Sequence, residues 1–266
     1  MKKISVYCLI VLIMLTVLSC EKNQTANEYK AKAVVEAYLM ANQTMRVHIT
    51  KEILCTSAAD TAETLDALTV KIIHNDNIYI LTAKGSGNYV SDSTLIVTEG
   101  DTYKLEFEYD NNIISSSATI PSKPTGLTTS ATSISVVAFD PSGGTMPTFP
   151  DPIKLTWNNP DNNYFLIVVK NVETSLDPIN DSINDKPHAF RNEPSQINSY
   201  EIQAMSFIYY GTHHILLYKL NPEYALLYND NGNNSQNLTT PVSNITNGLG
   251  IFTGINADSV TVEVTN

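Results

Sequence analysis

Apolar and polar residues alternate in short stretches along most of this chain. The clearest stretch is Tyr103–Tyr109, whose apolar positions are Tyr103, Leu105, Phe107 and Tyr109. A period of two places such side chains on one face of a β-strand. Other alternating or apolar stretches cover residues 32–39, 45–50, 68–72, 78–81, 113–120, 153–157, 164–169, 207–220 and 259–264. Polar turn residues separate these stretches, so the pattern predicts an all-β protein.

The spacing of the strands predicts two tandem β-sandwiches. Residues 29–121 hold many short strands with regular turns, which is typical of a transthyretin-like or immunoglobulin-like sandwich. Residues 122–126 follow as a proline-stiffened linker. Residues 127–266 then predict a second sandwich, of fibronectin-III type. This second sandwich includes a short helix, Pro222–Tyr228, because Asn221 and Pro222 form a favourable helix start.

Two polar loops of the second half are candidate contact regions. Residues 140–152 are rich in proline and glycine, and residues at about 177–199 are rich in asparagine and proline. Long loops on a rigid scaffold often carry binding functions. We therefore expect a loop insertion at about 177–199 and expect any binding surface to involve it.

The first residues have the pattern of a bacterial lipoprotein signal. Lys2 and Lys3 precede an apolar run, Ile4–Leu18, and Cys20 stands directly before polar sequence. The run is shorter than the roughly 20 residues of a membrane-spanning helix, so a retained anchor is the weaker alternative, together with ordinary secretion. We expect residues 1–19 to be a signal peptide, Cys20 to carry acyl chains, and residues 20–28 to be a tether.

The remaining cysteines and the net charge limit the role of disulfides and the classes of binding partner. Cys8 leaves with the signal peptide, and Cys55 is then unpaired, so the fold depends on its apolar cores rather than on disulfides. The whole chain has a net charge of −11. Without Lys2 and Lys3, 14 basic residues face 27 acidic ones, which gives −13. This balance disfavours binding to nucleic acid, and it leaves attachment to the membrane to the acyl chains.

No motif of an enzyme or a cofactor site is present in the sequence. His213 and His214 are adjacent, so a strand places them on opposite faces, where they cannot chelate one ion together. The sequence Asn229–Asn234 has some likeness to a calcium loop, but it holds a single acidic residue and reads as a solvated turn. We expect no metal, no cofactor and no catalytic residues, and therefore a protein that is not an enzyme.

Four short segments fit a pattern for covalent modification. Each has aspartate, then serine or threonine, then, in three of the four, an apolar residue, which resembles bacterial O-glycosylation sites. The candidate acceptors are Thr61, Ser93, Ser182 and Ser259. Because the pattern is short, glycosylation at one or more of them is a hypothesis that intact mass would test.

The segment Ser243–Phe252 carries a resemblance to a known family. Its motif residues are Asn244, Asn247, Gly248, Leu249, Gly250 and Phe252. They resemble the closing motif of a large family of uncharacterised outer-membrane lipoproteins from Bacteroidota. The glycines fit tight backbone positions and the apolar residues fit a core, so we interpret the motif as structural.

The resemblance implies a function without naming a reaction. Members of that family are found beside TonB-dependent receptors, so it implies a non-catalytic accessory to nutrient transport that binds a ligand or the receptor through loops. Two alternatives stay open, a structural or adhesive surface lipoprotein and, third, a hydrolase without a visible motif. The expected location is the outer membrane, with the side that the protein faces left open.

Overall fold

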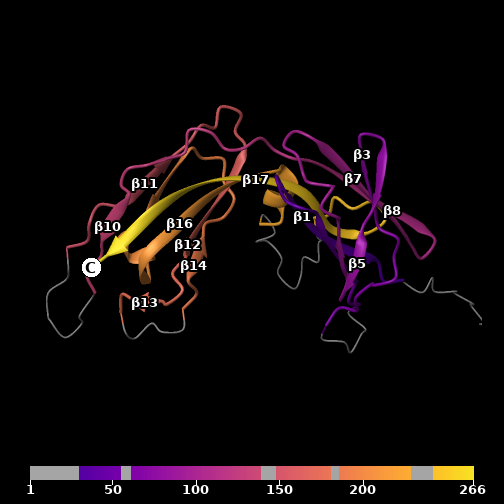
Figure 1. Cartoon of the computed structure of the whole chain (residues 1–266), viewed down its shortest axis with the longest axis horizontal. Helices are drawn as coiled ribbons and strands as arrows, with labels where there is room; N and C mark the ends of the chain where they lie inside the picture. Colours follow the sequence, from indigo (N-terminus) through magenta and orange to yellow (C-terminus); the bar gives the residue numbers. More distant parts are fainter. Residues whose placement is uncertain (1–29, 55–60, 139–147, 181–185, 229–241) are drawn as a thin grey trace, which may run out of the picture. The chain divides into compact units, whose positions relative to one another are not determined.

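The computed structural model describes residues 30–54, 61–138, 148–180, 186–228 and 242–266, and these are mostly β-strands (Figure 1). The predicted all-β class is therefore confirmed. Residues Lys32–Asn266 belong to one compact unit. None of the helices in the described ranges has the length and hydrophobicity that crossing a bilayer requires.

The largest sheet runs through both halves of the chain. Its strand order is β14-β12-β16-β17-β1-β2-β6-β5, with β10 also paired to β17 and β13 to β16. The bounds are β14 (Ala189–Arg191), β12 (Tyr164–Asn171), β16 (Tyr209–Leu220), β17 (Leu249–Thr265), β1 (Ala33–Met40), β2 (Arg46–Lys51), β6 (Asn88–Val90), β5 (Thr82–Gly85), β10 (Ser133–Ser135) and β13 (Asp177–Pro178).

A four-stranded sheet packs against the β17–β5 portion of the large sheet and forms the first sandwich. Its order is β4 (Asn77–Ile80), β3 (Lys71–His74), β7 (Thr102–Tyr109) and β8 (Asn112–Thr119). The core between the two sheets includes Val35, Val47 and Tyr89 from one side and Leu105 and Phe107 from the other. The alternation of Tyr103–Tyr109 points its apolar residues into this core, as the sequence predicts.

A three-stranded sheet covers the other portion and forms the second sandwich. Its order is β15 (Ser199–Ile202), β11 (Ile153–Thr156) and β9 (Thr128–Thr129). Trp157, directly after β11, is buried and stacks at a tilt on Phe165, with ring centroids 5.6 Å apart. The only tryptophan of the chain therefore belongs to the second core.

Strand β17 belongs to both sandwiches. Residues 249–255 run parallel to β1, and residues 255–264 run antiparallel to β16. In Figure 1 the yellow strand passes from the strands near β1 to those near β16. The sequence division placed all of 127–266 in the second sandwich, and the pairing of 249–255 with β1 differs from it. Alternation identifies a strand but does not say which sheet the strand joins.

Hydrogen bonds from β17 and its neighbours hold the predicted linker in place. The Asn256 side chain donates to the Pro121 carbonyl oxygen at 3.0 Å and to a Glu99 carboxylate oxygen at 3.1 Å. Lys123 forms an ion pair with Asp258 at 2.9 Å. Residues 121–123 are therefore attached to the large sheet rather than extended freely between two bodies.

Two hairpins turn through asparagine and aspartate instead of glycine. Between β3 and β4, Asn75 and Asp76 have φ of 48° and 62°, and between β7 and β8, Asp110 and Asn111 have φ of 50° and 59°. Positive φ at both central residues is typical of a type I′ turn, and these residue types tolerate it. The polar residues between the stretches 68–72 and 78–81 thus form the turn of a β3–β4 hairpin.

The structure differs in detail from the loop expected at 177–199 and from the expected helix. Part of the loop forms β13 and β14, which pair with β16 and β12. Strands of two or three residues carry too little alternation to be seen in sequence.

The helix α2 (Pro222–Leu226) ends two residues before the expected end at Tyr228. Asn221 precedes it without a side-chain cap, because its amide donates to the Thr119 carbonyl oxygen at 2.9 Å.

The adjacent histidines of β16 lie on opposite faces, as predicted. His214 is exposed, whereas His213 is 3% exposed in the second core. Nδ1 of His213 donates to the Gly211 carbonyl oxygen at 3.0 Å, and its ring packs edge-on against Phe207. Burial lowers the pKa of His213, and this outweighs the opposing effects of the Gly211 carbonyl and of the Glu263 and Glu173 carboxylates.

We expect His213→Gln to flatten the dependence of stability on pH. Because the pKa of His213 is lowered in the folded protein, the unfolded chain binds more protons below about pH 6.5, and the free energy of unfolding falls there. Denaturant unfolding from about pH 8 to about pH 5 measures this slope. The matched variant His214→Gln should keep the wild-type slope, and equal slopes for wild type and His213→Gln would contradict the assignment.

Candidate functional site

A groove lies on the outer face of the large sheet, where the two sandwiches share it. Its volume is about 250 Å³. We call it the tyrosine groove, and its lining residues are Tyr38, Met40, Leu166, Val168, Arg191, Tyr218, Leu220, Tyr224 and Ile255. They come from β1, β12, β14, β16, β17 and α2. None of these residues was singled out from the sequence.

Strand alternation explains how the groove is made. On β12, Phe165, Ile167 and Val169 face the second core, so Leu166 and Val168 face the opposite way. The same alternation on β1 sends alanine, valine and leucine into the first core and leaves Tyr38 and Met40 outside. The nearly continuous apolar run of β12 therefore has one face in the second core and the other in the groove floor.

Aromatic contacts close one side of the groove. The rings of Tyr38 and Tyr224 meet edge to face with centroids 5.6 Å apart, and Tyr224 and Tyr228 lie 5.8 Å apart. The hydroxyls of Tyr224 and Tyr228 are 3.4 Å apart. The Arg191 guanidinium carbon lies 5.7 Å from the centre of the Tyr228 ring. This arrangement orients Arg191 by a cation–π contact.

The tyrosine hydroxyls stay protonated over the physiological range. Burial, with a further effect of the Glu36 charge, raises the pKa of Tyr38 to about 12. Burial also raises the pKa of Tyr224, as does the hydrogen bond with Tyr228, and burial alone raises that of Tyr218. A protonated phenol both donates and accepts hydrogen bonds. The groove thus offers neutral polar groups and one permanent cation around an aliphatic floor.

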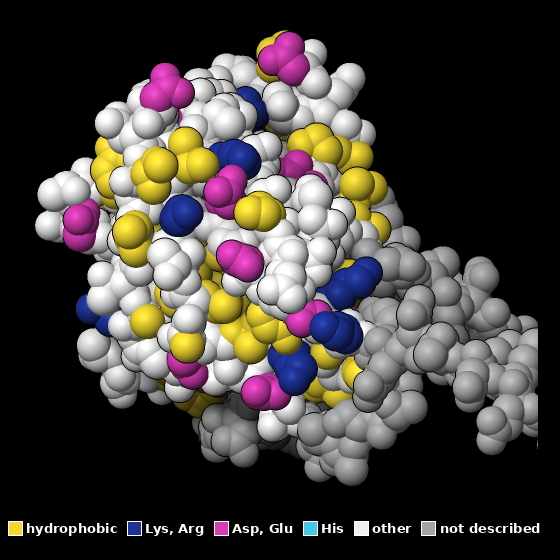
Figure 2. Space-filling model, turned by 90° about the vertical axis from the view of Figure 1, so that its right-hand side faces the viewer, with side chains coloured by type: hydrophobic (Ala, Val, Ile, Leu, Met, Phe, Trp, Pro, Cys, Tyr) yellow, Lys and Arg dark blue, Asp and Glu magenta, His cyan; other side chains and the backbone are white. Residues whose placement is uncertain are grey.

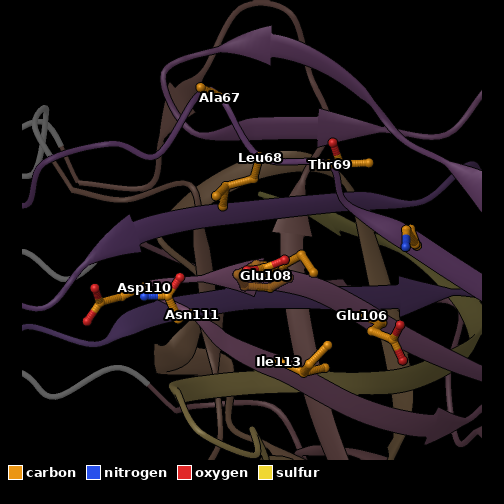
Figure 3. A pocket seen from close by; sticks show the side chains of 10 residues that line it. Ala67, Leu68, Thr69, Glu106, Glu108, Asp110, Asn111 and Ile113 are labelled. Atoms are coloured by element: carbon orange, nitrogen blue, oxygen red, sulfur yellow. The ribbon is translucent and has the colours of Figure 1, made fainter.

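A second hollow, larger and more polar, lies on the first sandwich. It has a volume of about 620 Å³, and its lining comes from the segment Ala67–Thr69 and from β3, β7, β8 and the β7–β8 turn (Figure 3). Figure 3 shows Glu106 and Asp110 at opposite ends of it. Glu106 is also paired with Lys104 at 3.0 Å. Glu106 and Asp110 therefore do not converge on a point where they could act together on one group.

The face of the first sandwich that Figure 2 shows carries mixed side chains. Figure 2 shows acidic, basic and apolar residues interspersed on this face, without a continuous basic area. That distribution offers no electrostatic track for a nucleic-acid backbone on the face shown. Among the residues that the structure describes, no cluster of three or more histidine, cysteine or acidic side chains could hold a metal ion.

The motif of residues 244–252 ties the two sheets of the first sandwich together. The Asn244 side chain accepts from the Phe252 amide at 3.0 Å and donates to the Phe252 carbonyl at 2.7 Å. The carbonyl oxygen of Asn244 accepts from Ser116 on β8 at 2.8 Å, and Asn247 donates to the Ile113 carbonyl at 2.9 Å. Phe252 itself is fully buried in the first core.

The motif glycines stand where a side chain would not fit. A Cβ on Gly250, whose φ is +102°, would overlap the carbonyl oxygen of Val35 on the paired strand β1. A Cβ on Gly248 would lie 2.9 Å from Ile245 and 3.0 Å from the Ala33 carbonyl oxygen. Leu249 begins β17 opposite Val34. These contacts support the interpretation of the motif as structural.

The chain matches a known protein family. Residues 22–261 match the family described as Domain of unknown function (DUF4249). The chain belongs to that family. No curated protein matches the chain. The description of this family names no activity. The DUF4249 protein therefore belongs to an uncharacterised family, as the resemblance of its closing motif implied.

The candidate modification sites of the DUF4249 protein are exposed where they are described. Thr61, Ser93 and Ser259 are all exposed, and Ser182 lies outside the described residues. The turn around Ser93 is ordered by Asp92, whose carboxylate accepts from the Thr94 hydroxyl and backbone, and these bonds lower its pKa. Exposure satisfies one requirement for an acceptor, and glycosylation stays a prediction.

Other predicted features lie outside the described residues. These are the lipidated Cys20 with the signal peptide and tether, the thiol of Cys55, most of the loop 140–152, and the calcium-like sequence Asn229–Asn234. Sequence reasoning missed the tyrosine groove because its lining comes from six separate elements. The one available signal was the apolar run of β12, which indicated a covered outer face without saying what covers it.

We expect Gly250→Ala to reduce the free energy of unfolding by about 3 kcal/mol or more, because it combines positive φ with backbone overlap. The matched variant is Gly85→Ala, where φ is +85° and no atom lies within 4 Å of an added Cβ. Its expected loss is about 1–2 kcal/mol. Denaturant unfolding measures both, and equal losses would show that the approach of β1 to Gly250 is unimportant.

Proposed function

We propose that this DUF4249 protein is a non-catalytic binding lipoprotein of the outer membrane that assists a TonB-dependent nutrient transporter. The observation that carries the proposal is the tyrosine groove. Its lining offers an aliphatic floor, neutral hydroxyls and one guanidinium, and it includes no histidine, cysteine or carboxylate. Such a lining suits recognition of a ligand, because convergent polar groups around an apolar floor give orientation without supplying a proton-transfer pair.

The position of the groove supports a role in binding. Its walls come from strands of both sandwiches, and β17 and the hydrogen-bonded segment at 121–123 join these sandwiches. A groove on joined elements is pre-organised, so less conformational freedom is lost when a ligand binds. Family membership is consistent with the proposal, since the closing motif resembles lipoproteins whose genes accompany those of transporters.

In this proposal the acyl anchor on Cys20 keeps the protein at the membrane beside the transporter. Two or more acyl chains on Cys20 would hold the protein stably at the membrane, whereas one chain gives marginal binding. Confinement of the protein and a transporter to one membrane raises the effective concentration of each beside the other. A weak contact between them is then sufficient for transfer of a ligand.

We expect the native lipoprotein to co-purify with a TonB-dependent receptor from outer membranes solubilised in mild detergent. Mass spectrometry of the purified material measures the stoichiometry. A lipoprotein that purifies alone, from membranes where such receptors are abundant, would contradict the accessory role and favour the structural or adhesive alternative.

We expect Cys20→Ala to abolish lipidation and to remove the protein from the outer-membrane fraction. The first acyl carrier attaches through the thiol of Cys20, and the later acylation needs the amine that cleavage before Cys20 frees, so the variant offers neither group. Intact mass and membrane fractionation measure the effect. Cys55→Ala serves as the matched control and should keep both the acyl mass and the location, and a Cys20→Ala protein that still carries acyl chains would refute the assignment.

A further inference from the structure

The floor of the tyrosine groove is aliphatic. Leu166, Leu220 and Ile255 form its base and are 5%, 4% and 8% exposed. Val168 and Met40 continue the apolar surface at its sides. A ligand that enters must therefore place an apolar part of its body against these side chains, because a polar part would lose its hydration there without gaining partners.

Arg191 places a positive charge at the edge of this apolar floor. It is one of two arginines in a chain of net charge −11, and it is exposed at the end of the edge strand β14. Among the described residues it has no ion-pair partner, and its guanidinium is oriented by the Tyr228 ring. A guanidinium in such a position presents paired N–H donors that match the two oxygens of a carboxylate.

A second polar group lies free in the groove. The Tyr218 hydroxyl has no hydrogen-bond partner within the described part of the chain, although its side chain is half-buried. The other tyrosines of the wall already interact with each other. Tyr218 is thus available to a ligand as donor or acceptor.

Two other ligand classes fit less well. Tyrosine rings can enclose an organic cation, but Arg191 would repel it. A neutral sugar needs several side-chain hydrogen bonds, and the base of the groove offers none. The volume of about 250 Å³ lies just below the usual range of roughly 300–1,000 Å³ for ligand pockets, which favours a small molecule.

We infer that the tyrosine groove binds a small amphipathic anion, with its apolar body on the Leu166–Leu220–Ile255 floor and its carboxylate against Arg191. This inference rests on the proposed function, because it names the ligand class of the same site. The Tyr218 hydroxyl supplies a further hydrogen bond to the bound anion.

The test uses the full lipoprotein reconstituted in lipid nanodiscs and calorimetric titration, with empty nanodiscs as the blank. The probes are hydrocinnamate, its neutral amide and the corresponding primary amine, which share one apolar body and differ in charge. We expect the carboxylate to bind at least about tenfold more tightly than the amide, since hydrogen bonds to a charged partner are the stronger ones. The amine should bind most weakly.

Variants locate the binding site. Arg191→Gln should remove the preference for the carboxylate, and the other arginine gives the matched control, Arg46→Gln, which should keep it. Val168→Phe, which fills the groove, should weaken binding of all three probes. Circular dichroism and thermal unfolding establish that each variant is folded.

Four outcomes would overturn the inference. They are equal binding of carboxylate and amide, a preference that survives Arg191→Gln, probe binding that Val168→Phe leaves unchanged, and no binding of hydrocinnamate tighter than about 1 mM. Each leaves the co-purification experiment standing. A lipoprotein that purifies without a receptor, conversely, would end the accessory role while leaving this result intact.

Discussion

The close approach of β17 to β1 is the contact on which the rest of the structure depends. Gly250 allows the two backbones to meet, because any side chain there would strike the Val35 carbonyl oxygen. Once β17 lies in that place, its remaining residues extend the same sheet into the second sandwich and pair with β16. The side chains of Asn244 and Asn247 attach the opposite sheet to the start of the same strand. One strand therefore sets the register of two cores.

The tyrosine groove follows from this shared sheet. A sheet that is buried on one face in each sandwich leaves its other face to be covered. On that face Leu166 of β12, Leu220 of β16 and Ile255 of β17 pack together. Helix α2 brings Tyr224 over this region, and the hydroxyl of Thr253, in β17, donates to Glu223 at 2.8 Å to hold the helix there. The tyrosine groove thus lies where the two sandwiches join, on strands and a helix that structural contacts already hold in place.

The sequence was a good guide to local structure and a poor one to long-range pairing. Alternation in Tyr103–Tyr109 and the turn at Asn75–Asp76 identify a core strand and a hairpin because their signals lie within a few residues. The opposite faces of His213 and His214 follow from the same period of two. The groove could not be found in this way, since Tyr38 of β1 and Arg191 of β14 line one groove only when the intervening strands have joined into one sheet. The short strands β13 and β14 were missed because their partners, and not their own residues, make them strands.

The parallel pairing of β1 with β17 also constrains the order of folding. Val34 and Leu249 pair although nearly the whole described chain lies between them. Contacts of such long sequence separation form slowly, because the chain loses the entropy of closing a large loop before the pairing contributes any stabilisation. Strand β17 follows every other described strand, so neither sandwich can complete its part of the large sheet before this segment has emerged. A chain organised in this way completes its large sheet only after its last described strand has been synthesised.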